Sequence, residues 1–137
     1  MIKLLDLLKE DSPFISRGGK ERIEIFWMDK IQQYIKDGMI GNLNLQFAPI
    51  TSLPDNLTVG RDLYLNKTKI TKLPDNLTVG GSLYLYRVPI TTLPPNLKIG
   101  GDLYLDHTPL SKNHSKDEIR AMVKNLKGEN FEGRISI

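Results

Sequence analysis

The octapeptide LPDNLTVG stands at Leu53–Gly60 and again at Leu73–Gly80, and the variant LPPNLKIG follows at Leu93–Gly100. The segments between these copies match one another too: LNLQFAPIT, LYLNKTKIT, LYLYRVPIT and LYLDHTPLS begin at residues 43, 63, 83 and 103. The chain therefore repeats itself every twenty residues across residues 41–112. A fixed period of this length predicts a solenoid, because one unit can bury its apolar face only against its neighbours.

One unit shows how a coil is built. Leu63 and Leu65 alternate with polar or aromatic residues at the period of a strand, so they face inward and Tyr64 faces outward. Pro74 and its equivalents exclude a regular helix from the return side of the coil. Glycine begins each unit, as at Gly80, where we expect the chain to turn sharply back into the strand. Repeated turns of this kind place the strands side by side, in a parallel ladder with about 4.8 Å per coil.

The run L-x-L-x-x-T-x-I-x-x-L-P resembles a leucine-rich repeat of the short, twenty-residue bacterial type. The wording LPDNLTVGG is similar to repeats of phage-encoded and bacterial proteins. The resemblance implies an α/β fold: a short leucine-rich-repeat solenoid with a parallel β-sheet on one face. The family usually carries a buried Asn where this chain has Ala48, Thr68, Val88 and Thr108. Backbone groups at this position therefore need other partners, which a Thr hydroxyl can supply and Val88 cannot.

The flanks of the repeat predict helical caps over its apolar ends. Residues 1–40 form the N-terminal cap, with a short helix over residues 2–9 and a longer amphipathic helix over residues 20–36. The four coils of residues 41–112 follow, and residues 113–137 form a C-terminal helical cap and tail. We expect these three parts to make one structural domain.

The C-terminal cap begins where Asn113 takes the place of the leucine that starts each LPxNL segment. Ser115 and Glu118 then form a capping box, which predicts the start of a helix. The apolar side of that helix is expected to hold Ile119, Met122, Val123 and Leu126, and Gly128 is expected to end it. Phe131 and Ile135 fall in a short tail, which could add a final strand.

Composition excludes several classes of protein. The 137 residues carry a net charge of +3, which is too small and too dispersed to indicate a nucleic-acid-binding protein. The absence of cysteine agrees with a reducing compartment and excludes disulfides, thiolate metal sites and cysteine nucleophiles. No apolar stretch is long enough to span a membrane, and the first residues do not resemble a signal peptide. We therefore expect a cytoplasmic protein that does not bind membranes.

The sequence offers little catalytic chemistry. His107 and His114 lack the closely spaced companion ligands that a metal site needs. Asp62 and Asp102 share an outward column but lie two coils apart, and nothing between them indicates a pocket. The glycine turn at residues 17–20 lacks the strand that precedes a phosphate-binding loop. We therefore predict no enzymatic activity, no metal, no cofactor and no small-molecule substrate.

The outward side of the strands carries most of the tyrosines. Tyr64, Tyr84 and Tyr104 form one column, and Tyr86 lies in the next column, between Asn66 and Asp106. A basic column of Lys67, Arg87 and His107 lies just beyond. These tyrosines could stack between coils and contribute about 0.2–1 kcal/mol per pair. They could equally bind a protein, because Tyr and Arg are enriched at binding hot spots.

We therefore predict a non-enzymatic module for protein–protein interaction. The residues expected to contact the partner are Tyr64, Tyr84, Tyr86, Tyr104, Arg87, Asn66, Asp102 and Asp106. The resemblance to phage repeats implies a phage-encoded protein that binds or inhibits a host protein, such as a defence component, in the host cytoplasm. Two alternatives remain open: single-stranded nucleic-acid binding through the tyrosine and basic columns, and structural self-association through an exposed sheet end.

Overall fold

The computed structural model describes residues 19–137, which belong to two compact units, residues 1–38 and residues 39–137. The described part of the first unit is helix α2 (Gly19–Lys36), which confirms the helix predicted over residues 20–36. Gly38 closes it in a left-handed conformation, with φ 93°, and its N–H donates to the carbonyl of Ile35 at 3.1 Å. The helix predicted over residues 2–9 lies outside the described residues, and the expected role of α2 as a cap stays a prediction.

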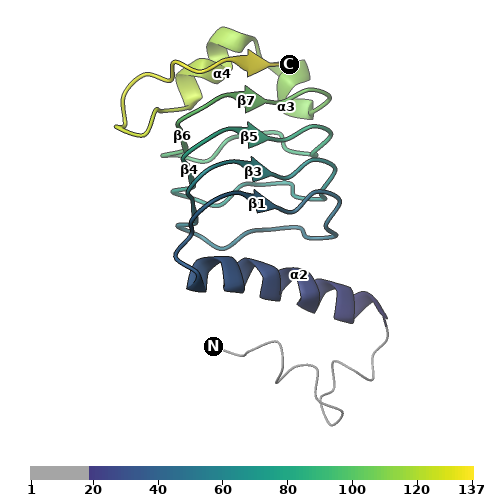
Figure 1. Ribbon diagram of the computed structural model, residues 1–137. Coiled ribbons are helices and arrows are strands. Elements are labelled where there is room, and N and C mark those ends of the chain that lie inside the picture. The colour runs from purple at the N-terminus through teal and green to yellow at the C-terminus, as the bar shows by residue number, and fades with distance from the viewer. Residues whose placement is uncertain (1–18) are drawn as a thin grey trace. The chain divides into compact units, whose positions relative to one another are not determined.

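The second unit is a parallel β-solenoid of about three turns (Figure 1). One sheet runs in the order β1 (Leu43–Asn44), β3 (Leu63–Tyr64), β5 (Leu83–Tyr84), β7 (Leu103–Tyr104) and β8 (Ile135–Ser136). The return side holds a second sheet, in the order β2 (Thr58–Val59), β4 (Thr78–Val79) and β6 (Lys98–Ile99).

Both sheets are in register from coil to coil. Within the repeats, each residue pairs with the residue twenty positions later, as in Leu43 with Leu63 and Val59 with Val79. The repeated leucines form the core, and Leu63 and Leu65 are fully buried. The predicted parallel ladder of inward-facing leucines is therefore confirmed, and it aligns every outward column of side chains.

The glycines between coils allow close approach of two backbones. Gly80 does not adopt a positive φ, so a left-handed turn is not what requires a glycine there. A methyl group at Gly80 would instead collide with the carbonyl oxygen of Gly60 in the coil before. A methyl group at Gly100 would collide in the same way with the carbonyl oxygen of Gly80. A column of glycines therefore lets successive coils stack at strand spacing.

The position that lacks the expected asparagine satisfies its backbone within each coil. The N–H of Ala48 donates to the carbonyl of Leu45 at 3.1 Å, and the equivalent bond recurs in the later coils. The Thr68 hydroxyl adds a bond of 2.8 Å to the carbonyl of Leu65, as predicted, and Thr108 repeats it. Among the described residues no buried side-chain nitrogen or oxygen lacks a partner.

The fourth unit starts as a coil but is completed by helices. After β7 the chain forms α3 (Pro109–Asn113) and α4 (Lys116–Met122) in place of a fourth return side. The predicted capping box is present: the Ser115 hydroxyl accepts from the Glu118 N–H, and the Glu118 carboxylate accepts from the Ser115 N–H. The array therefore has about three complete turns, although four units were counted in the sequence.

Helix α4 ends at Met122, earlier than the predicted end at Gly128. The reason is that Lys124 joins the return-side sheet: its N–H donates to Leu97 and its carbonyl accepts from Ile99, both at 2.9 Å. Leu126, expected on the apolar side of the helix, is consequently 47% exposed. The tail then adds β8 beside β7, which confirms the final strand. No helix in the described part of the chain is long and apolar enough to cross a membrane.

Candidate interaction face

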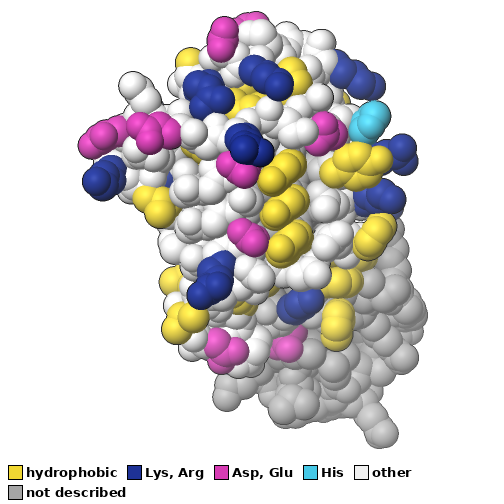
Figure 2. Space-filling view, turned by 45° about the horizontal axis from the view of Figure 1, so that its top comes forward, with side chains coloured by type: hydrophobic (Ala, Val, Ile, Leu, Met, Phe, Trp, Pro, Cys, Tyr) yellow, Lys and Arg dark blue, Asp and Glu magenta, His cyan; other side chains and the backbone are white. Residues whose placement is uncertain are grey.

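The in-register strands turn three tyrosines into one stacked column. Tyr64 and Tyr84 have ring centroids 4.6 Å apart at 11°, and Tyr84 and Tyr104 have centroids 4.6 Å apart at 4°. This separation matches the spacing of adjacent strands, about 4.7–4.9 Å, so the stack follows directly from the register. Both faces of Tyr84 are therefore occupied by its neighbours. Figure 2 shows this side of the molecule, with a column of hydrophobic side chains rising through its centre.

The hydroxyls of this column stay protonated at neutral pH. Partial burial raises the pKa values of Tyr64, Tyr84 and Tyr104 above 10.0, and nearby carboxylates raise them further. The Tyr64 hydroxyl donates to Asp62 Oδ2 at 3.2 Å, and the Tyr104 hydroxyl to Asp102 Oδ2 at 3.5 Å. Tyr64 and Tyr104 thus stack on Tyr84 with one ring face each, while their hydroxyls already have a partner.

Polar side chains beside the tyrosines connect one coil to the next. Asp62 Oδ1 accepts from the Ser82 N–H at 2.7 Å, Ser82 Oγ from the Asp102 N–H at 3.0 Å, and Asp102 Oδ1 from the Arg134 N–H at 2.9 Å. The sequence interpretation missed this ladder, although a small polar residue at the same place in every unit could have indicated it. These side chains hold the backbone of the neighbouring coil in position.

Two further residues of the predicted site have similar partners. Asn66 Oδ1 accepts from the Tyr86 N–H at 2.9 Å, and both carboxylate oxygens of Asp106 accept from the Ser136 hydroxyl at 2.8 Å. The structure therefore places Asn66, Asp102 and Asp106 on the expected face, but their oxygens bond to adjacent coils.

A different group of side chains forms the exposed part of this face, and we call it the corner cluster. The Lys67 ammonium lies 5.2 Å from the ring centroid of Phe47 and 5.9 Å from that of Tyr86. The Arg87 guanidinium lies 5.3 Å from the same Tyr86 ring, which meets His107 edge-on at 5.3 Å. The corner cluster thus consists of Phe47, Lys67, Tyr86, Arg87 and His107, and its contacts run through four successive coils.

The sequence interpretation included Tyr86 and Arg87 in the site but left Phe47 out. Phe47 is 65% exposed, and it occupies the same place in its unit as Lys67, Arg87 and His107 in theirs. That shared place in the repeat is the signal that could have found it.

Four members of the corner cluster have a left-handed backbone. Phe47, Lys67, Arg87 and His107 have φ values of 64°, 59°, 58° and 62°. The left-handed conformation costs a residue with a side chain roughly 1–2 kcal/mol. Cross-coil bonds hold it in place: the Phe47 N–H donates to the carbonyl of Asn66 at 3.0 Å, and the Lys67 N–H to that of Tyr86 at 2.9 Å. The exposed side chains therefore project from a fixed and strained backbone.

The two strong cations of the corner cluster are not neutralised locally. Within residues 19–137, neither Lys67 nor Arg87 forms an ion pair with a carboxylate. Their contacts are with aromatic rings, which favour a cation without cancelling its charge. Figure 2 shows basic side chains, a histidine and hydrophobic side chains along the right edge of this face, whereas acidic and basic side chains are mixed to the left of the hydrophobic column. The right edge of this face is therefore both basic and aromatic.

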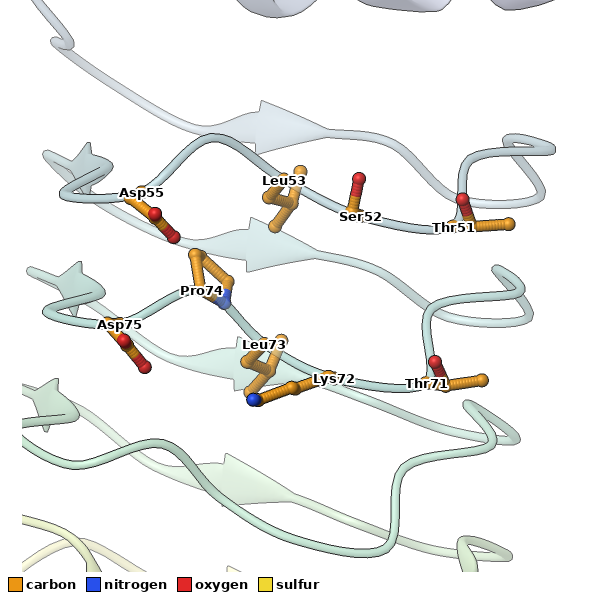
Figure 3. A pocket seen from close by; sticks show the side chains of 9 residues that line it. All are labelled: Thr51, Ser52, Leu53, Asp55, Thr71, Lys72, Leu73, Pro74 and Asp75. Atoms are coloured by element: carbon orange, nitrogen blue, oxygen red, sulfur yellow. The ribbon is translucent and has the colours of Figure 1, made fainter.

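The return side holds a shallow hollow between two coils (Figure 3). Asp55 and Asp75 lie one above the other at one end of it, and Lys72 lies on the lower coil. The residues that line it are Thr51, Ser52, Leu53, Asp55, Thr71, Lys72, Leu73, Pro74 and Asp75. The described residues include no group of three side chains able to hold a metal ion. This hollow has the character of an ordinary polar surface.

Comparison of the chain with protein-family models, with curated proteins and with solved structures gives no match. The side chains of the outward face are therefore the basis for assigning a function.

Proposed function

We propose that this chain is a non-enzymatic module that binds another protein through the outward face of its parallel strands. The observation that carries the proposal is the corner cluster. Its aromatic and basic side chains, all exposed except the half-buried Tyr86, contact one another through four coils, and four of them project from a backbone held in the left-handed conformation. Tyr and Arg at rigid positions are the residues most enriched among binding hot spots.

Preorganisation makes this face suited to binding. Ordering a flexible Lys or Arg side chain at an interface costs about 0.5–1.5 kcal/mol. Contacts with the Tyr86 ring already restrict Lys67 and Arg87, and cross-coil hydrogen bonds fix the backbone beneath them. A partner would therefore meet side chains whose positions are largely set beforehand.

A protein partner fits this face better than single-stranded nucleic acid does. Proteins that bind single-stranded nucleic acid stack its bases on the open faces of aromatic side chains. Here Tyr64, Tyr84 and Tyr104 stack on one another, so Tyr84 has no open face.

We further propose that the coils form a short leucine-rich-repeat array and that the partner is a bacterial host protein. The inward Leu-x-Leu pairs and the parallel register support the first part. The similarity of LPDNLTVGG to phage and bacterial repeats supports the second. Neither part depends on the chemistry of the corner cluster.

The proposal can be tested by photo-crosslinking in a bacterial lysate treated with nuclease. Benzoylphenylalanine replaces Phe47, an aromatic residue, in the full chain; the control carries it at Thr71, which is exposed on the return side. We expect a discrete protein adduct from position 47 and none of the same mass from position 71. The same adducts from both positions, no adduct from position 47, or an adduct of twice the mass of the chain would overturn the proposal, the last in favour of self-association.

A further inference from the structure

We infer that the corner cluster recognises an extended, acidic protein segment that carries an apolar side chain on the same face as its carboxylates. This inference rests on the proposed function and adds to it the chemistry of the partner.

A comparison of the two left-handed positions of the repeat indicates that the residues of the corner cluster are selected for their side chains and not for their backbone preference. Each of the three complete coils has two non-glycine positions in the left-handed conformation, and the fourth unit has one. One of the two positions holds Asn in every complete coil, at Asn56, Asn76 and Asn96, and Asn tolerates that conformation well. The other holds four different residues, none of them Asn or Gly: Phe47, Lys67, Arg87 and His107. The backbone alone would favour Asn or Gly there as well.

The charge of the corner cluster indicates an anionic partner. Lys67 and Arg87 lie in successive coils, both over the Tyr86 ring, and neither pairs with a carboxylate of the described residues. The carboxylate of Asp106 accepts from the neutral hydroxyl of Ser136 and forms no ion pair with either cation. A carboxylate from a partner would be the natural counter-charge, because complementary charges set specificity and register across interfaces.

The shape of the corner cluster indicates an extended segment. It presents one residue position per coil, and the coils follow one another at about 4.8 Å. Its four coils therefore span roughly 14 Å, the length of about four residues of an extended peptide at ~3.3 Å per residue. The exposed ring of Phe47 lies at one end, where it offers an apolar contact. An extended segment with an apolar side chain two residues from its acidic side chains, and so on the same face, would satisfy both the ring and the cations.

The experiment uses the full chain and a fluorescent peptide in which Glu and Leu residues are separated by single Ser residues, so that Glu and Leu share one face of the extended peptide. Its comparison probes are the same peptide with Lys in place of Glu and a single-stranded oligothymidylate, all followed by fluorescence anisotropy at low salt. The test variant is Lys67→Asn with Arg87→Asn, because the chain itself places Asn at the other left-handed position. The control variant, Lys72→Asn with Lys127→Asn, removes the same charge from exposed positions elsewhere.

We expect the acidic peptide to bind the parent chain and the control variant, and the Lys peptide not to bind. The test variant should lose affinity by about tenfold or more, as at a hot spot, while its melting temperature stays equal or rises. Arg87→Lys keeps the charge and should retain most of the binding. Together these results would show that Lys67 and Arg87 contribute to binding, although residues at these left-handed positions reduce the stability of the fold.

Undiminished binding by the test variant, or equal losses in Arg87→Lys and the test variant, would overturn the inference. Tighter binding of oligothymidylate than of the acidic peptide at the same residues would overturn it in favour of nucleic acid. Absence of binding to the acidic peptide, while position 47 still forms a protein adduct, would refute the acidic segment and leave the proposed function standing.

Discussion

Glycine and asparagine occupy the positions at which the backbone of each coil is most constrained. Gly80 leaves space for the carbonyl of Gly60, which a methyl group would strike. Asn76 adopts a left-handed conformation, and its amide donates to Asn56 Oδ1 at 2.9 Å. Stacking of the coils therefore depends on the small size of one residue type and on the backbone tolerance of the other.

We expect Gly80→Ala to destabilise the fold much more than Gly128→Ala. The first substitution forces two backbones apart, and no rotamer change relieves that, so the cost should be about 3 kcal/mol, the upper end of the usual range for overpacking. The second meets open space and only a left-handed φ of 81°, with a cost of about 1 kcal/mol. Urea unfolding of both variants measures the difference. Equal losses would show that the coils do not approach through the glycine column.

Alkaline pH should loosen the tyrosine column. Burial raises the folded-state pKa values of Tyr64, Tyr84 and Tyr104 above 10.0, so the folded chain holds these protons more tightly than the unfolded chain. Their contribution to stability is complete below the unfolded-state pKa of 10.0 and is lost as the pH rises through the folded pKa values. Tyrosinate absorbance should rise at higher pH in the native chain than in urea. Coincident titrations would contradict the stacked, half-buried column.

At the scale of elements, the helices at the end of the array replace a fourth return side. Thr108 caps α3 by accepting from the Ser111 N–H at 3.1 Å, and Ser115 with Glu118 caps α4. Because each of the two helices has its own N-cap residue, the chain changes from the repeat to helices within a few residues. The last return-side strand, β6, then gains Lys124 as its neighbour.

The capping box of α4 should contribute measurably to stability. We expect Ser115→Ala to cost about 1 kcal/mol, since the Glu118 N–H loses its acceptor at the first turn. Ser52→Ala, at an exposed position of the return side, serves as the control and should cost little. Urea unfolding of both variants provides the comparison. A loss no greater than that of the control would mean that the capping box adds nothing to the fold.

The elements also show how far sequence reasoning reaches. Strand positions, register and the capping box of the fourth unit were predictable, because repeated Leu-x-Leu pairs and a capping box act locally. The end of α4 was not, because Lys124 leaves the helix to bond with Leu97 and Ile99, more than twenty residues earlier in the chain. Such competition between a helix and a distant sheet has no local signature.

The candidate site also has features that the sequence could predict and features that it could not. The tyrosine stack followed from the register, and so did the outward position of Tyr86 and Arg87. The partners of Asp102 and Asp106 were not predictable, because Arg134 and Ser136 reach them from a tail outside the repeat. Nor was the left-handed backbone of the corner cluster, since Phe and Arg carry no preference for it.

At the scale of the whole molecule, residues 39–137 act as a stack in which each coil supports the next. The absence of cysteine allows a direct test of this arrangement. Lys67→Cys with Arg87→Cys places two cysteines in adjacent coils. Their Cα atoms are then about 4.8 Å apart, which lies within the range of Cα separations in disulfides. Phe47→Cys with Arg87→Cys spans two coils, about 9.6 Å. We expect oxidation to join the first pair and spare the second; equal yields would refute the register.

The central claim is that the outward face of the in-register coils is the surface that meets a partner. Amide hydrogen exchange of the full chain, alone and bound to the protein captured at position 47, tests it most directly. We predict added protection at residues 47, 67 and 87 and none at residues 51–55 and 71–75 of the return side. Protection gained on the return side, with the outward face unchanged, would contradict the account.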